Sequence, residues 1–131
     1  MIRLSELTEA LTETLAARVA ELRVVRGNEL HCSVRPLDVA ALAALLRRGF
    51  GAELVFMAAD DRRADRGVFE VHYLFAPERA PWFLHATAAV PADAPALGSL
   101  ATFHYPASRF EREIYDLFGI TAEGHPDPRP L

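Results

Sequence analysis

The chain has 131 residues, of which 51% are hydrophobic and 24% charged, and its formal net charge is -4. This composition is that of a globular domain with one core, and the acidic balance argues against nucleic-acid binding. No apolar run approaches the roughly 20 residues that span a bilayer, and the first residues lack the apolar segment of a signal peptide. We therefore expect a cytoplasmic protein. The single cysteine, Cys32, excludes an internal disulfide and fits a reducing compartment.

The N-terminal part of the chain predicts a helix followed by a hairpin. Apolar residues recur at spacings of three and four over residues 4–22, which is one helical face, and Ser5 is a suitable N-cap. Gly27 and Asn28 lie between two apolar runs and predict a hairpin turn. In residues 30–34 the alternation predicts a strand whose core side carries Leu30, Cys32 and Val34.

The middle of the chain predicts a second helix and three strands. The helix should begin near Asp38, and Gly49 can close it. Residues 53–59 read as a largely buried strand, residues 68–75 as an alternating strand and residues 82–90 as a fifth strand, with a charged loop at 60–67 between the first two. In the alternating strand the predicted core side carries Phe69, Val71, Tyr73 and Phe75.

This order of elements predicts an α+β fold in two layers. About five strands form a mixed or antiparallel sheet covered by two helices, followed by a short C-terminal helix and an extended tail. We expect residues 1–120 to form one domain and residues 121–131 to form the tail, because prolines at 126, 128 and 130 disfavour regular structure.

The C-terminal helix is predicted over residues 109–118. Ser108 and Glu111 have the spacing of a capping box, and Gly119 stands where a helix needs a left-handed residue. The predicted core side of this helix carries Phe110, Ile114, Leu117 and Phe118.

Residues 110–120, FEREIYDLFGI, followed by Gly124-His125-Pro126-Asp127, resemble the signature of one family. It is the small accessory C subunit of NADH-quinone oxidoreductase (respiratory complex I), together with the related N-terminal module of membrane-bound hydrogenase large subunits. The resemblance extends loosely over nearly the whole chain. Family members commonly continue past this segment, whereas this sequence stops at Leu131.

The resemblance implies a non-catalytic accessory subunit without a cofactor of its own, peripheral to the cytoplasmic membrane and touching it only through a complex. The implied partners are the large subunit of the parent complex, near the quinone-side electron path, and the neighbouring iron–sulfur subunit. The C-terminal helix carries more charges than capping requires, and a proline-rich tail follows it. Both features indicate a docking surface for the partner at this end of the chain. The predicted docking face consists of Arg112, Glu113, Asp116, Gly124, His125, Pro126 and Asp127.

Two alternatives remain open at the level of the sequence. In the first, the chain is the leading domain of a hydrogenase-4 or formate-hydrogenlyase-type large subunit. In the second, it is a small free-standing enzyme. The enzyme hypothesis requires one pocket lined by Glu111, Glu113, Asp116 and His125.

The sequence contains no metal or cofactor motif. Its five histidines are widely separated, there is no cysteine cluster for iron–sulfur binding, and the glycines do not form a phosphate-binding loop. We therefore expect exposed or hydrogen-bonded histidines and no bound metal.

Overall fold

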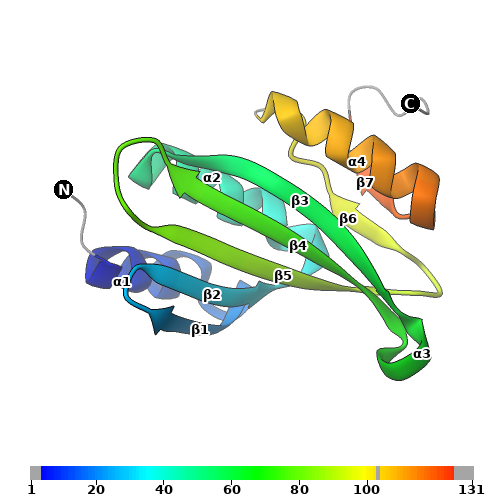
Figure 1. Cartoon of the computed structure of the whole chain (residues 1–131), viewed down its shortest axis with the longest axis horizontal. Coiled ribbons are helices and arrows are strands. Elements are labelled where there is room, and N and C mark those ends of the chain that lie inside the picture. The colour runs from blue at the N-terminus through cyan, green and yellow to red at the C-terminus, as the bar shows by residue number, and fades with distance from the viewer. Residues whose placement is uncertain (1–3, 103, 126–131) are drawn as a thin grey trace.

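A five-stranded mixed sheet forms the framework of the protein (Figure 1). The structure is a computed structural model that describes residues 4–102 and 104–125. The strand order is β1-β2-β5-β4-β3, in which β2 and β5 are parallel and all other neighbours antiparallel. The strands are β1 (Val19–Arg26), β2 (Glu29–Val34), β3 (Ala52–Arg62), β4 (Val68–Pro77) and β5 (Phe83–Pro91). The predicted α+β class and the mixed five-stranded sheet are confirmed.

Helices cover one face of this sheet, as Figure 1 shows for α2. The helices are α1 (Leu4–Leu15), α2 (Val39–Phe50), the short α3 (Arg63–Arg66) and α4 (Tyr105–Phe118), with 3₁₀ turns at Ala16–Arg18 and Pro36–Asp38. A second, two-stranded parallel sheet joins β6 (Ala96–Gly98) to β7 (Thr121–Glu123). Among the helices in the described ranges, none is long and apolar enough to cross a membrane.

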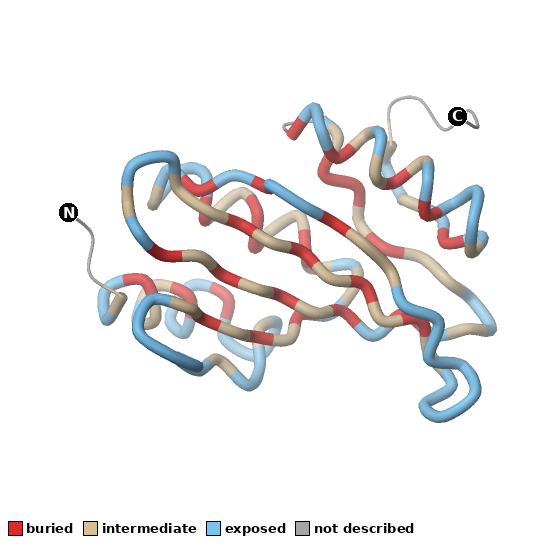
Figure 2. Tube along the Cα trace, in the orientation of Figure 1, coloured by how far each residue is buried: buried red, intermediate tan, exposed pale blue. Residues whose placement is uncertain are grey.

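The core lies between α1, α2 and the inner face of the sheet. Buried and half-buried residues alternate along β4 and β5 (Figure 2). The predicted register of β4 is confirmed, because Phe69, Val71, Tyr73 and Phe75 are all buried. Cys32 is buried as predicted, and burial raises the pKa of its thiol to about 12.

The turn between β1 and β2 is confirmed as a hairpin, with Arg26 paired to Glu29. Gly27 has a positive φ of 47°, which glycine adopts at little cost. The side-chain amide of Asn28 donates to the carbonyl of Pro81, which ties the hairpin to the segment before β5.

The first helix is shorter than predicted. It ends at Leu15, and Val19 and Leu22 lie in β1 instead. The register of β1 shifts between Ala20 and Arg23, and Glu21 has a positive φ of 55°. Because of this bulge, Val19 and Leu22 both pack against the core although they are three residues apart. Their spacing is therefore that of a helix although they lie in a strand. Ser5 lies inside the helix and not at its cap.

Two other boundaries differ from the prediction. Helix α2 ends at Phe50, with the left-handed Gly51 (φ 65°) as its C-cap, so Gly49 lies inside the helix and does not close it. Strand β3 is not largely buried: Val55 and Phe56 are about half exposed, because β3 is an edge strand with β4 as its one sheet neighbour. It also continues to Arg62, into the loop expected at 60–67, and α3 occupies residues 63–66 of that loop.

The domain extends further toward the C-terminus than predicted. Thr121–Glu123 pair with β6, and the backbone N–H of Thr121 donates to the carbonyl of Pro95. Residues 121–125 are therefore held on the domain, whereas a loosely held tail was expected from residue 121. The division at residue 120 and the partner-binding role of the tail stay predictions. Backbone groups of residues 95–98 pair with residues 121–123, which gives this segment a strand partner. The rest of the predicted tail, residues 126–131, lies outside the described residues.

Candidate docking site around the C-terminal helix

Helix α4 begins at Tyr105, with His104 at its N-cap position, and ends before Gly119, whose φ is 71°. Pro106 lies in the first turn, where its fixed φ suits a helix and its missing N–H costs nothing. Ser108 is therefore inside the helix, and the predicted capping box does not form.

Glu111 is a buried anchor and not a capping residue. Its residue exposure is 2%, and its carboxylate accepts hydrogen bonds from Ser99 Oγ at 2.6 Å and from the backbone N–H of Leu100 at 2.7 Å. Burial raises the pKa of this carboxyl, while the bonds from Leu100 and Ser99 act in the opposite direction. Glu111 therefore fixes α4 to the segment that follows β6.

His125 fixes the other end of the site. Its side chain is only 3% exposed, and Nε2 lies 3.3 Å from both Oγ and the carbonyl oxygen of Ser108. The same nitrogen is 3.8 Å from Oε1 of Glu111. The imidazole thus holds the end of the described chain against α4, so any contribution of His125 to docking is through positioning.

The inner face of α4 packs on the edge of the main sheet. Phe110 meets Phe56 with ring centroids 5.7 Å apart, and Phe118 meets Phe69 at 5.6 Å. Ile114 is 4% exposed. Leu117, which was predicted on this face, is 66% exposed. The buried Glu111 occupies part of the inner face of α4, and Leu117 points away from that face.

A small pocket of about 210 Å³ opens between α4 and β7, and its lining includes Glu111, Arg112 and His125. Glu113 does not line it; this residue borders a different hollow at the N-terminal half of α4. Asp116 is exposed and lines neither. The structure therefore does not assemble the four residues of the enzyme hypothesis into one site.

The outward face of α4 combines charge with exposed apolar side chains. Glu113 and Asp116 are exposed and Arg112 is half-buried. Beside them lie Leu117 and Tyr105, which is 88% exposed. Gly124, also exposed, has a φ of 83° and turns the chain after β7. Pro126 and Asp127, the remaining members of the predicted docking face, lie outside the described residues.

Known proteins resemble the chain over most of its length. The family described as "Respiratory-chain NADH dehydrogenase, 30 Kd subunit" matches residues 32–131. This chain belongs to that family. Members of the family similar to it include the C subunit of NADH-quinone oxidoreductase from Rhodobacter capsulatus, 34% identical over 133 residues that cover 91% of this chain and 64% of the relative. The corresponding protein of Jannaschia sp. (strain CCS1) is 32% identical over 132 residues, covering 98% and 63%. The chain thus spans a little under two thirds of these relatives.

A solved structure of the trypsin-resistant fragment (1-134) of Nqo5 has the same fold, with a TM-score of 0.71 and 24% identity. The match covers 96% of this chain and 99% of that chain. Membership of this NADH dehydrogenase subunit family, expected from the C-terminal signature, is confirmed.

Several residues of the site in this NADH dehydrogenase-type domain were not predicted from the sequence. Ser99 and Leu100, the partners of Glu111, lie 12 and 11 positions before it, and no local pattern links them to it. Tyr73 was predicted only as a core residue, yet burial and the charge of Glu111 both raise the pKa of its hydroxyl.

Proposed function

We propose that this chain is a non-catalytic accessory and assembly subunit of a membrane-associated NADH-quinone oxidoreductase-type complex. Membership of the family and similarity to subunits of NADH-quinone oxidoreductases support this assignment. The observation that carries the docking proposal is the outward face of α4, which lies within the stretch that the family pattern matches.

The docking proposal rests first on how α4 is used. Its inner face is occupied, because Ile114 and Glu111 are buried in the domain. Its outer face presents Glu113 and Asp116 next to Leu117, a large apolar side chain that its own domain leaves exposed. Charges around an apolar centre are the usual composition of a protein–protein interface, with the charges giving specificity.

The end of the described chain supports the same surface. The backbone carbonyl of Glu123 accepts a hydrogen bond from the backbone N–H of Ser99, and the imidazole of His125 is buried against α4. These contacts fix the point from which Pro126 and Asp127 follow.

The proposed partner at this face is the large subunit of the parent complex, with the iron–sulfur subunit as a neighbour. The domain would be peripheral to the cytoplasmic membrane on its cytoplasmic side and would reach the membrane only through these partners. In this role the chain holds no redox cofactor and contributes by positioning the subunits that carry electrons toward quinone.

Affinity purification tests this assignment. An affinity-tagged chain expressed in its source organism should bring down a large subunit and iron–sulfur subunits from gently solubilised membranes, at a fixed ratio to the bait. The same extraction with an untagged chain is the control. Recovery of a nickel–iron-type large subunit would assign the domain to a hydrogenase-type complex, and recovery of the bait without partners would contradict the assembly role.

A further inference from the structure

Three histidines that are far apart in the sequence meet on the outer face of the sheet, opposite α2. His31 of β2 and His85 of β5 are direct register partners, with ring centroids 4.7 Å apart. His72 of β4 stacks on His85, and Nδ1 of His72 lies 2.9 Å from Nε2 of His85. The strand order β2-β5-β4 creates this cluster, which the spacing along the chain does not reveal.

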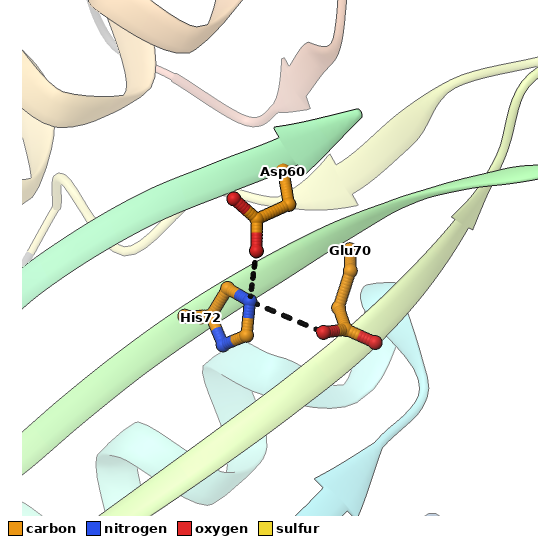
Figure 3. Close-up of side chains that lie close together, drawn as sticks. All are labelled: Asp60, Glu70 and His72. Atoms are coloured by element: carbon orange, nitrogen blue, oxygen red, sulfur yellow. Dashed lines mark hydrogen bonds and ion pairs between the residues drawn. The ribbon is translucent and has the colours of Figure 1, made fainter. Parts of the chain in front are cut away.

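Two carboxylates complete the cluster on the side of β3. Asp60 of β3 and Glu70 of β4 are register partners, and both face His72 (Figure 3). Oδ2 of Asp60 lies 3.1 Å from Nε2 of His72, and Oε1 of Glu70 lies 3.2 Å from the same nitrogen. The other oxygen of Glu70 pairs with Arg66, so Oε1 remains directed at the imidazole.

We propose that Asp60, Glu70 and His72 form a binding site for one divalent transition-metal ion, for which Zn²⁺ is the natural candidate. One ligand atom from each residue lies within 4.8 Å of the other two. Ligands at roughly 2.0–2.2 Å from a tetrahedral Zn²⁺ are about 3.3–3.6 Å apart. The distances from Nε2 of His72 to the two carboxylate oxygens are close to that spacing. Rotation of the exposed Asp60 side chain can adjust the third distance, between the oxygens of Asp60 and Glu70. Water takes the fourth position.

His85 provides the support that such a site needs. Nε2 of His85 lies 2.9 Å from Nδ1 of His72, where it can accept an N–H from that nitrogen while Nε2 of His72 is directed at the carboxylates. A ligating histidine typically donates its second N–H in this way, and the bond fixes its tautomer and orientation.

The competing explanation is that Nε2–H of His72 donates to the carboxylates and that no ion binds. The two explanations differ in a measurable way. If the ion binds, it displaces the proton from Nε2 of His72; if it does not, added Zn²⁺ leaves the chain unchanged. The ion would also join β3 to β4 near the α3 end of this hairpin, so it should raise the melting temperature of the chain.

Isothermal titration calorimetry with ZnCl₂ on the untagged chain, freed of metal by chelation, tests the proposal. We expect one Zn²⁺ per chain, no binding of Mg²⁺, and a higher melting temperature with Zn²⁺. His72→Ala should abolish binding, and Asp60→Asn and Glu70→Gln should each weaken it at least about tenfold. His85→Phe, which changes a supporting residue, should weaken it about 10–100-fold.

His31→Ala is the matched control, because His31 belongs to the same histidine cluster but contacts no proposed ligand atom; binding should persist. Asp60 lies at the surface, so Asp60→Asn keeps the test valid if His72→Ala does not fold. Absence of Zn²⁺ binding would overturn the proposal. Binding that survives Asp60→Asn and Glu70→Gln but disappears in His31→Ala would also overturn it, by moving the ion to the histidines.

Discussion

The carboxylate of Glu111 in α4 accepts a hydrogen bond from the backbone N–H of Leu100, 2.7 Å away, in the segment after β6. This contact and the bond from Ser99 join α4 to the small β6–β7 sheet. The outward face of α4 therefore has a fixed orientation relative to residues 121–125. A docking surface that is built from α4 and these residues requires such a fixed orientation.

Replacing Glu111 with alanine should lower the free energy of unfolding by about 1–3 kcal/mol, because the N–H of Leu100 and the hydroxyl of Ser99 lose a buried acceptor. Glu113→Ala, two residues along the same helix but exposed, is the control and should change stability by no more than about 0.5 kcal/mol. Urea denaturation of both variants measures the difference. Equal effects would contradict the anchoring role.

The titration of Glu111 should appear in the pH dependence of stability. Its pKa is raised by burial in the folded state, so the unfolded chain loses this proton first as pH rises above about 4.3. The stability that Glu111 contributes is therefore fully present below that value and falls as pH rises through the folded pKa. Compared with Glu111→Gln, the wild type should lose relative stability on going from acid toward neutral pH. A relative gain over that range would show that the hydrogen bonds outweigh burial.

Leu117 and Ile114 provide a matched pair for the orientation of α4. Ile114→Ala should cost about 2–5 kcal/mol because the side chain is buried, whereas Leu117→Ala should cost no more than about 0.5 kcal/mol. Thermal or chemical denaturation measures both. Comparable losses would place Leu117 in the core, as its spacing in the sequence suggests, and would remove it from the docking surface.

Gly119 ends α4 in a left-handed conformation with open space around its Cα. Gly119→Ala should therefore destabilise the domain by about 1–2 kcal/mol through backbone strain alone. Gly49→Ala is the contrasting variant: Gly49 lies within α2, and an added Cβ would meet Leu45 at an ordinary 3.8 Å. It should stabilise the domain by about 0.5–1 kcal/mol. Opposite signs in denaturation experiments are the expected result.

Local patterns were sufficient for much of the fold. The alternation of β4, the Gly27-Asn28 turn and the start of α2 near Asp38 each depend on near neighbours in the chain, and the structure has them where the sequence predicts them. The failure at Val19 and Leu22 has a physical cause, because a β-bulge gives a strand the spacing of a helix.

The site was less predictable because it depends on contacts between distant segments. The spacing of Ser108 and Glu111 fits a capping box, but Pro106 starts the helix earlier and Glu111 finds its donors in Ser99 and Leu100. The histidine cluster likewise depends on β5 lying between β2 and β4, an order that periodicity does not encode. Membership of the NADH dehydrogenase subunit family was predicted from the C-terminal signature as a whole.

Docking of the outward face of α4 on the large subunit can be tested by charge reversal. Glu113→Lys combined with Asp116→Lys reverses two exposed charges on that face, and Glu9→Lys combined with Glu13→Lys reverses two exposed charges on α1. The decisive measurement is the amount of large subunit that co-purifies with each tagged variant, relative to wild type. Docking through α4 predicts at least a roughly fivefold loss for the α4 variant, corresponding to about 1 kcal/mol, with a melting temperature close to wild type and no loss for the α1 variant. Normal recovery of the large subunit with the α4 variant would contradict it.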